Sequence, residues 1–314
     1  MATAESERAG ERSRWDDYGP DPDSEWRRID WREHLRSLSV RGAHVNLVDI
    51  GSGPVVVLVH GLGANWQCWL ENIPHFAASN RVIALDLPGF GLSEMPAEKI
   101  SINGYAQVLD AVLGELGVER ASVVGNSMGG FVACEMAISF PERVERIVLV
   151  AAAVLWRERR RARPLVVFNR LTSAVGAKAA AQWQLAVHRP RLRLPALAWA
   201  GVRHPRKIPV DLAYEVMQAS GAPGWPDALR ALYDYELRDR LPEIDVPTLI
   251  VWGAFDPLVP VQHAFELERL IPDSRVIVFP DTGHEPMFER PDRFNRALEA
   301  FLADDVDAVA RISA

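Results

Sequence analysis

The run Val123-Val124-Gly125-Asn126-Ser127-Met128-Gly129-Gly130 decides the fold of this chain. Its two valines end a predicted strand, and a predicted helix begins at Met128. Gly125 and Gly129 flank the serine at the two positions where a side chain would collide with a tight crossing of strand and helix. Such a turn strains Ser127, points its Oγ outward and leaves the first helical N–H groups available to an oxyanion. Because any glycine-rich turn can contain a serine, the rest of the chain has to decide its role.

Strands and helices alternate on both sides of this run. Continuous apolar, β-branched runs predict buried strands over 55–59, 81–85, 121–124, 147–150, 247–252 and 275–279. A hairpin is expected over 38–49, and helices are expected over 66–78, 101–117, 128–140, 261–271 and 291–302. The spacing predicts an α/β fold, in which helices cover both faces of a mostly parallel, doubly wound sheet.

The alternation stops at about Val154 and resumes after Arg240. Between these points there is no strand pattern, and prolines interrupt helix-like segments. We therefore expect an all-helical insertion over 154–240, inside a core formed by 25–153 and 241–314. Residues 1–24 are rich in charge, proline, glycine and serine, which predicts a disordered tail. The residues after Ala303 are expected to form a short charged extension.

Tryptophans follow the predicted tail. Trp26 and Trp31 are expected to dock on the body of the protein, and the alternative is a surface for a second subunit or a lipid boundary. Cys68 and Cys134 have no metal-like spacing and are predicted to be buried free thiols, which fits a reducing compartment.

Bulk properties exclude several classes. The net charge of −7 over 314 residues argues against nucleic acid as the main partner. The polar N-terminus lacks an apolar signal core, and no apolar run is long enough to span a bilayer. A cytoplasmic protein is therefore expected. The glycine-rich runs fit neither a P-loop nor a dinucleotide fingerprint, so no cofactor and no metal is predicted.

Two further residues follow predicted strands in the manner of Ser127. Asp256 comes after the strand that ends at Trp252, and His284 comes after the last strand. Because ligands bind at the carboxyl ends of parallel strands, these side chains are expected to meet. A serine hydroxyl needs a base, which His284 can provide, and Asp256 can fix the imidazole tautomer. The N–H of Met128, just after the serine, can receive the oxyanion.

The order Ser, Asp, His resembles the α/β-hydrolase family. The resemblance covers roughly residues 38–303 and includes His60-Gly61 after a strand and the loop Asp86–Ser93. It implies a Ser127–His284–Asp256 triad, the N–H of Leu62 as second oxyanion donor, and a helical cap formed by the insertion. His60 and Asp86 are expected to brace their loops.

The residue types favour a carboxylic-ester hydrolase acting through an acyl-enzyme. Dehalogenases and epoxide hydrolases of this fold carry aspartate where this chain has Ser127, and haloperoxidases usually have an aromatic residue at the Leu62 position. The alternative is a hydrolase of carbon–carbon bonds in aromatic ring-fission products, a group that often carries the same Gly-Asn-Ser-Met-Gly-Gly run. Its members usually differ in the oxyanion loop and at Glu285. A non-catalytic binding protein of the same fold is a second alternative.

The first half of the cap is basic. Between Trp156 and Lys207 the only acid is Glu158, against thirteen cations: Arg157, Arg159, Arg160, Arg161, Arg163, Arg170, Lys178, Arg189, Arg191, Arg193, Arg203, Arg206 and Lys207. Leucines and tryptophans lie between them. This pattern suits peripheral contact with anionic lipid, an anionic group on the substrate, or docking of the cap on the acidic body. The favoured hypothesis for a bound partner is a small-molecule ester with an apolar tail, presented at a lipid surface.

Overall fold

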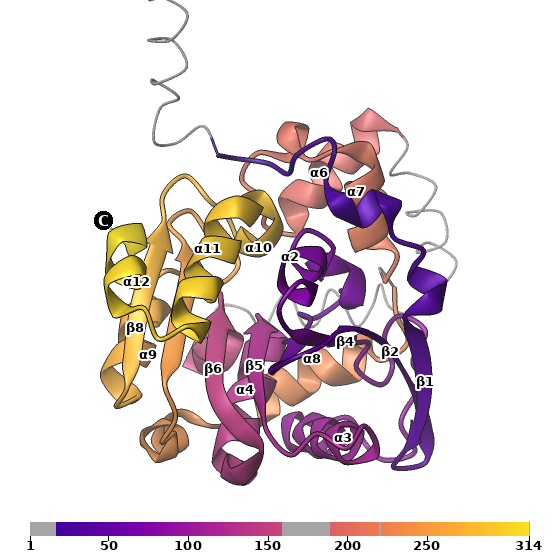
Figure 1. Cartoon of the computed structure of the whole chain (residues 1–314), viewed down its shortest axis with the longest axis vertical. Helices are drawn as coiled ribbons and strands as arrows, with labels where there is room; N and C mark the ends of the chain where they lie inside the picture. Colours follow the sequence, from indigo (N-terminus) through magenta and orange to yellow (C-terminus); the bar gives the residue numbers. More distant parts are fainter. Residues whose placement is uncertain (1–16, 159–188, 220, 314) are drawn as a thin grey trace, which may run out of the picture.

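The computed structural model describes residues 17–158, 189–219 and 221–313. Its centre is one eight-stranded sheet with the order β1-β2-β4-β3-β5-β6-β7-β8 (Figure 1). The strands are β1 (Leu35–Val40), β2 (Ala43–Gly51), β3 (Val55–Val59), β4 (Arg81–Leu85), β5 (Ala121–Asn126), β6 (Val144–Val150), β7 (Thr248–Gly253) and β8 (Ser274–Phe279). β2 pairs antiparallel with β1 and β4, and the remaining pairs are parallel. The predicted α/β fold is confirmed.

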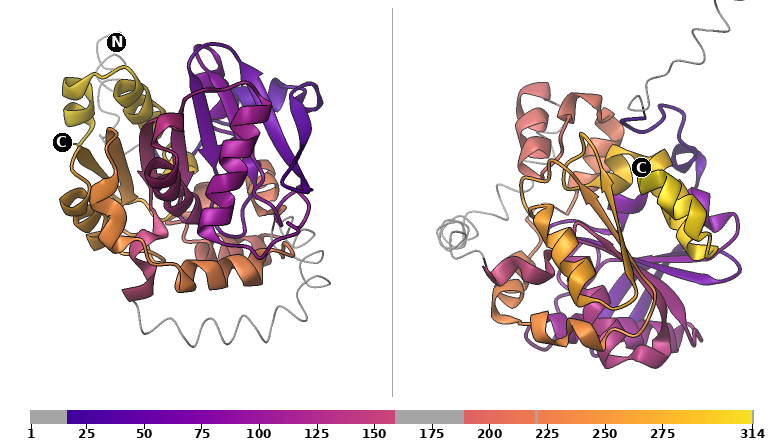
Figure 2. Two further views of the ribbon diagram at one scale, coloured as in Figure 1. Left: turned by 90° about the horizontal axis from the view of Figure 1, so that it is seen from below. Right: turned by 90° about the vertical axis from the view of Figure 1, so that its left-hand side faces the viewer.

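Helices cover both faces of the sheet (Figure 2). α3 (Ile102–Glu115), α4 (Met128–Ser139) and α9 (Gln262–Leu270) pack in one hydrophobic core, and α2 (Ile73–Ala77), α11 (Pro291–Leu302) and α12 (Val306–Ser313) pack in the other. Successive side chains of a strand point to opposite faces of the sheet. Accordingly, Val123 belongs to the first core and Val124 to the second. β5 is therefore buried on both sides, which fixes the turn that follows it.

Every described element of the insertion is helical. Between β6 and β7 lie η5 (Ala153–Glu158), α6 (Pro190–Trp199), η7 (Pro205–Lys207), α7 (Val210–Met217), α8 (Trp225–Asp234) and η8 (Arg238–Glu243). α6 and α7 add apolar side chains to the core around α2 and α11, whereas α8 adds its own to the core around α3 (Figure 1). The helical cap predicted from the sequence therefore contacts both layers of the body.

Two predicted elements differ from the structure. The helix expected over 66–78 is divided into η3 (Trp66–Trp69) and α2, with the short α10 (Pro286–Glu289) beside η3. Pro74 explains the break, because a continuous helix would need its missing N–H and would bring its ring against the carbonyl of Leu70. The charged extension expected after Ala303 contains a helix that the sequence analysis did not predict, α12, which buries Val309 in the second core.

The N-terminal arm also corrects the predicted boundary. The disordered tail was expected through residue 24, yet Tyr18 is buried and Gly19 N–H donates to the carbonyl of Glu289. η1 (Glu25–Arg28) and η2 (Trp31–Glu33) follow. Trp26 is buried and Trp31 packs on Trp66, so the predicted docking of both is confirmed. Trp15 and the rest of 1–16 lie outside the described residues.

Candidate active site

The turn between β5 and α4 holds Ser127 in a strained backbone conformation. Its φ is 51° and its ψ is −110°, in the positive-φ half of conformational space that non-glycine residues rarely occupy. A Cβ at position 125 would lie 2.1 Å from the carbonyl oxygen of Gly129, and one at position 129 would lie 2.2 Å from that of Val59. Both glycines are therefore required by the close crossing, and the partly exposed serine projects from it.

Asp256 and His284 form a buried pair. Asp256 Oδ2 lies 2.7 Å from His284 Nδ1, and the exposed fractions of the two side chains are 0% and 4%. The other carboxylate oxygen, Oδ1, accepts the N–H groups of Leu258 and Val259 at 2.8 and 2.9 Å. The carboxylate is thus fixed by its own loop and can orient the imidazole without moving.

The pair lies at the same edge of the sheet as the serine. Asn126, which precedes Ser127, donates its side-chain N–H to the carbonyl of His284 at 3.4 Å. The loop after β3 also lies against the serine, because a Cβ on Gly61 would lie 3.2 Å from Cβ of Ser127. The structure therefore brings together the four chain segments that carry the predicted triad and the predicted oxyanion donors Leu62 and Met128.

His60 and Asp86 brace the loops around the site, as the sequence predicts. His60 is fully buried, its Nε2 accepts the N–H of Leu87 at 3.0 Å, and its Nδ1 lies 2.7 Å from the carbonyl of Gly61. Asp86 accepts the backbone N–H groups of Trp66 and Leu92, both at 2.9 Å. Burial lowers the pKa of His60, which keeps the ring neutral for this structural role.

The cap touches each of these loops. The carbonyl of Gly201 accepts the N–H of His284 at 3.0 Å, and Gly224 N–H donates to the carbonyl of Gly89 at 2.9 Å. A Cβ on Gly63, in the oxyanion loop, would lie 3.2 Å from the indole of Trp225. Cap and body are therefore joined at the loop that carries His284. A movement of the cap would displace this loop and change the position of the imidazole.

Glu289 is a residue of the site that the sequence reasoning missed. Its buried carboxylate accepts backbone N–H groups from Gly283 and Glu285, which flank the histidine, at 3.0 to 3.1 Å. It also accepts the N–H of Arg203 in the cap at 2.8 Å. Its spacing of five residues after His284 could have suggested that it binds the backbone of the histidine loop. The hydrogen bond that it accepts from the cap depends on tertiary structure and could not be predicted.

Charge around His284 favours its protonated form. Burial opposes protonation, but the charge and hydrogen bond of Asp256, aided by Glu285 and Glu289, outweigh burial and raise the pKa of His284 to about 9. Burial also raises the pKa of Glu285 to about 8, against the lowering effect of His284. Glu285 Oε2 is shielded from solvent and accepts no hydrogen bond within the part of the chain that the structure describes.

Replacing Glu285 by glutamine is expected to move the pH dependence of turnover. A base must be neutral, so activity should be lost as the pH falls through the pKa of His284, and it should rise between pH 7 and 9 in the unmodified chain. Glu285→Gln removes a negative charge that favours imidazolium, so the acid limb of kcat/KM should shift down by roughly half a unit to one unit. Profiles with a p-nitrophenyl ester measure this shift. Exposed Glu115→Gln is the matched control, and an unmoved or raised limb in Glu285→Gln would contradict the assignment.

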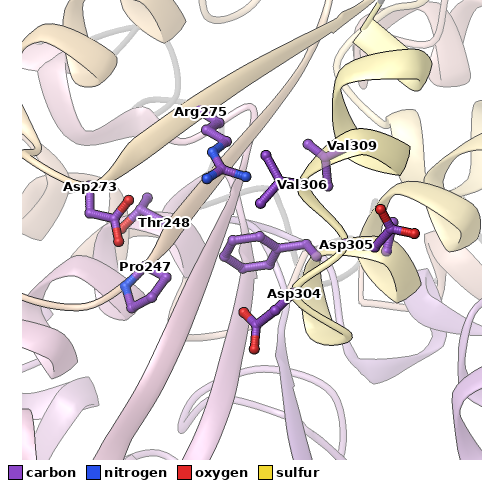
Figure 3. A pocket seen from close by; sticks show the side chains of 10 residues that line it. Pro247, Thr248, Asp273, Arg275, Asp304, Asp305, Val306 and Val309 are labelled. Atoms are coloured by element: carbon purple, nitrogen blue, oxygen red, sulfur yellow. The ribbon is translucent and has the colours of Figure 1, made fainter.

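A separate cavity lies at the opposite end of the sheet (Figure 3). Thr248 and Asp273 line it where β7 and β8 begin, and Val306 and Val309 of α12 close it. Its volume of about 90 Å³ is far below the roughly 300–1,000 Å³ of a typical ligand site. We therefore assign no part of the chemistry to it.

Among the residues that the structure describes, no three His, Cys, Asp or Glu side chains gather as metal ligands, and no helix has the length and apolarity to cross a membrane.

Comparison with known proteins identifies the family. The model of the alpha/beta hydrolase fold family matches residues 54–291, and the chain belongs to this family. It is 33% identical to a pimeloyl-[acyl-carrier protein] methyl ester esterase of Vibrio atlanticus, over 80% of this chain and 95% of that protein. It is 30% identical to a 2-hydroxy-6-oxo-6-phenylhexa-2,4-dienoate hydrolase of Burkholderia cepacia, over 83% and 91%. A membrane phospholipase A described as a bacterial virulence factor is structurally similar, with a TM-score of 0.68, 27% identity and 86% of each chain covered.

Proposed function

We propose that this protein hydrolyses carboxylic esters through an acyl-enzyme on Ser127. The observation that carries the proposal is the buried Asp256–His284 pair at 2.7 Å beside a serine held at positive φ. A strained serine next to an oriented imidazole is the arrangement that makes a hydroxyl nucleophilic at moderate pH. The esterase relative at 33% identity supports an ester as substrate.

The proposed reaction has two halves. His284 takes the proton of the Ser127 hydroxyl as its oxygen attacks the ester carbonyl, and the tetrahedral oxyanion is held by the N–H groups of Leu62 and Met128. The imidazolium then protonates the departing alcohol, which leaves an acyl ester on the serine. Water then attacks the acyl carbonyl as His284 takes its proton, and the imidazolium returns that proton to Ser127 Oγ as the acid leaves. Asp256 holds the ring throughout by its hydrogen bond to Nδ1.

Carbon–carbon bond hydrolysis is the second candidate. It is favoured by the run Gly125–Gly130 and by the ring-fission-product hydrolase at 30% identity. A panel of p-nitrophenyl esters of increasing chain length, set beside a ring-fission dienoate and a serine-directed fluorophosphonate, separates the possibilities. Ester turnover with labelling supports the esterase. Labelling with turnover of the dienoate alone supports the second candidate, and no labelling supports a binding protein.

We further infer that the cap contacts anionic lipid. The described part of its basic segment includes Arg189 and Arg191, both exposed, beside Leu192 and Trp199, whose exposed fractions are 40% and 67%. Phe255, which is 52% exposed next to Asp256, stacks under Arg203 at 4.1 Å and extends this surface to the site. Exposed aromatic rings among arginines are suited to an anionic bilayer interface. Arg206 and Lys207 of the predicted patch are exposed as well, and Arg193 is half-buried. Its other cations lie outside the described residues or have side chains that are not described.

Binding to vesicles tests the lipid contact. The protein should co-sediment with vesicles that contain phosphatidylglycerol, less with pure phosphatidylcholine, and less as salt is added. Trp199→Glu should weaken binding by roughly tenfold, because it removes an apolar anchor and adds a repelled charge. Phe265→Glu, on an exposed ring of α9 that is not part of the proposed surface, is the matched control. Equal binding of all three proteins, or none at low ionic strength, would exclude the contact.

A further inference from the structure

The N-terminal arm, residues 17–28, crosses the boundary between cap and core (Figure 1). In the figure the first coloured segment runs past α6 and α7 before it descends to β1. The arm precedes the part of the chain that the hydrolase family model matches, which begins at residue 54. Its contacts show what it does for the cap and the core.

The first anchor of the arm is Tyr18. Its ring is buried, and its hydroxyl donates to Glu289 Oε2 at 2.5 Å while accepting the backbone N–H of His204 at 2.8 Å. The ring packs edge-on against the imidazole of His204, with centroids 4.8 Å apart. One phenol thus joins the cap to the carboxylate that holds both neighbours of His284.

Ion pairs of the neighbouring Asp17 hold the same segment of the arm on the core. Asp17 pairs with Arg290 and, at 2.9 Å, with Nε of Arg293. Arg290 is almost fully buried, its Nε donates to Thr282 Oγ1 at 2.7 Å, and its guanidinium lies over the Tyr18 ring at 5.1 Å. Thr282 belongs to the loop that carries His284. The arm therefore reaches the histidine loop by two routes, through the carboxylate of Glu289 and through Arg290.

A second anchor lies six to nine residues after Tyr18, at Ser24, Trp26 and Arg27. The carboxylate of Glu71, in the core, accepts Ser24 Oγ–H at 2.6 Å and the indole N–H of Trp26 at 2.7 Å. Arg27 then donates to Asp211 on α7 of the cap at 2.7 Å. Core and cap are again bridged by adjacent residues of the arm, so the two bodies are tied at both ends of a short segment.

We propose that residues 17–28 act as a clamp that fixes the cap on the core, and that Tyr18, through Glu289, is a positioning residue for the catalytic histidine. This inference rests on the proposed function of His284. Without the phenol hydroxyl, Glu289 loses one of its donors and its link to His204. The carboxylate is then freer to turn away from the amides of Gly283 and Glu285, and the imidazole loses its alignment with Ser127.

Tyr18→Phe in the full chain tests the clamp, because it removes one oxygen and keeps the ring. We expect kcat for a p-nitrophenyl ester to fall about tenfold with little change in KM, since alignment of the base is lost and substrate contacts are kept. Amides of residues 281–289 should exchange hydrogen several-fold faster. The exchange measurement needs no activity, so it distinguishes failure of the clamp from failure of the proposed function, which would appear as full activity in Ser127→Ala.

Two further variants make the result decisive. Tyr105→Phe is the matched control, because it removes another buried tyrosine hydroxyl, bonded to the carbonyl of Pro88 at 3.2 Å, and should leave exchange at 281–289 unchanged. If Tyr18 acts through Glu289, then adding Tyr18→Phe to Glu289→Gln should cost no further activity. Unchanged exchange in Tyr18→Phe overturns the proposal, as does additivity of the two substitutions. Should Glu289→Gln fail to fold, the exchange comparison of Tyr18→Phe with Tyr105→Phe decides alone.

Discussion

Ser127→Ala is expected to reduce ester turnover by roughly 10⁴-fold or more while the chain keeps its fold. The substitution removes the only atom that bonds to the substrate in the proposed reaction, and the residual rate comes from binding and the oxyanion donors. The fold should tolerate alanine at this position, because a φ of 51° strains serine and alanine alike and the serine side chain is partly exposed. Rates on p-nitrophenyl esters, with circular dichroism for the fold, give the comparison.

A second serine, in the strand that leads to Ser127, provides the control. Ser122 is buried at the start of β5, and Ser122→Ala should leave turnover at the level of the unmodified chain. Full ester turnover in a folded Ser127→Ala variant would refute the acyl-enzyme. It would also point to direct attack by water, with His284 and Asp256 as the remaining candidates for the base.

Asp256→Asn is expected to lower kcat by roughly 10⁴-fold with the loop intact. An asparagine retains Oδ1 for the N–H groups of Leu258 and Val259, so the local backbone keeps its bonds. Its amide nitrogen would face Nδ1 of His284 and favour the tautomer with the proton on Nε2, which cannot accept a proton from the serine. The pKa of His284 should also fall, because burial then acts without the opposing carboxylate.

Measuring both quantities distinguishes the tautomer effect from general damage. The residual activity of Asp256→Asn should have an acid limb at lower pH than the unmodified chain, and the melting temperature should change little. A limb that stays in place, or activity within tenfold of the unmodified chain, would show that the carboxylate does not govern the imidazole.

The strand ends that carry the candidate site could be predicted from local sequence pattern. Ser127, Asp256 and His284 each follow a β-branched run, and alternation of strands and helices fixes which ends of those runs meet. The strands over 55–59 and 81–85 have the predicted bounds. The roles of His60 and Asp86 followed from their position in tight loops, and the structure confirms them. These features are encoded within a few residues of sequence.

Contacts between distant segments could not be predicted in this way. Tyr18 and Glu289 are separated by 271 positions, and neither carries a pattern that indicates the other. The composition of residues 1–24 predicts disorder. Composition cannot reveal that the single ring of Tyr18 is buried or that Asp17 pairs with Arg290, because both contacts depend on the folded body. The division of the helix over 66–78 did have a local cause in Pro74, which the apolar periodicity around it obscured.

A covalent acyl intermediate at Ser127 is the central step of the proposed reaction. Mixing the protein with a p-nitrophenyl ester on a rapid-quench instrument, followed by peptide mass spectrometry, measures it. Where deacylation is the slower half, we predict a burst of p-nitrophenol that approaches one equivalent per chain. The acyl mass should be found on the peptide that contains Ser127. In Asp256→Asn, neither the burst nor the acyl mass should appear on the same timescale. Ester turnover without any acyl mass on that peptide, under conditions that trap slow deacylation, would contradict the account.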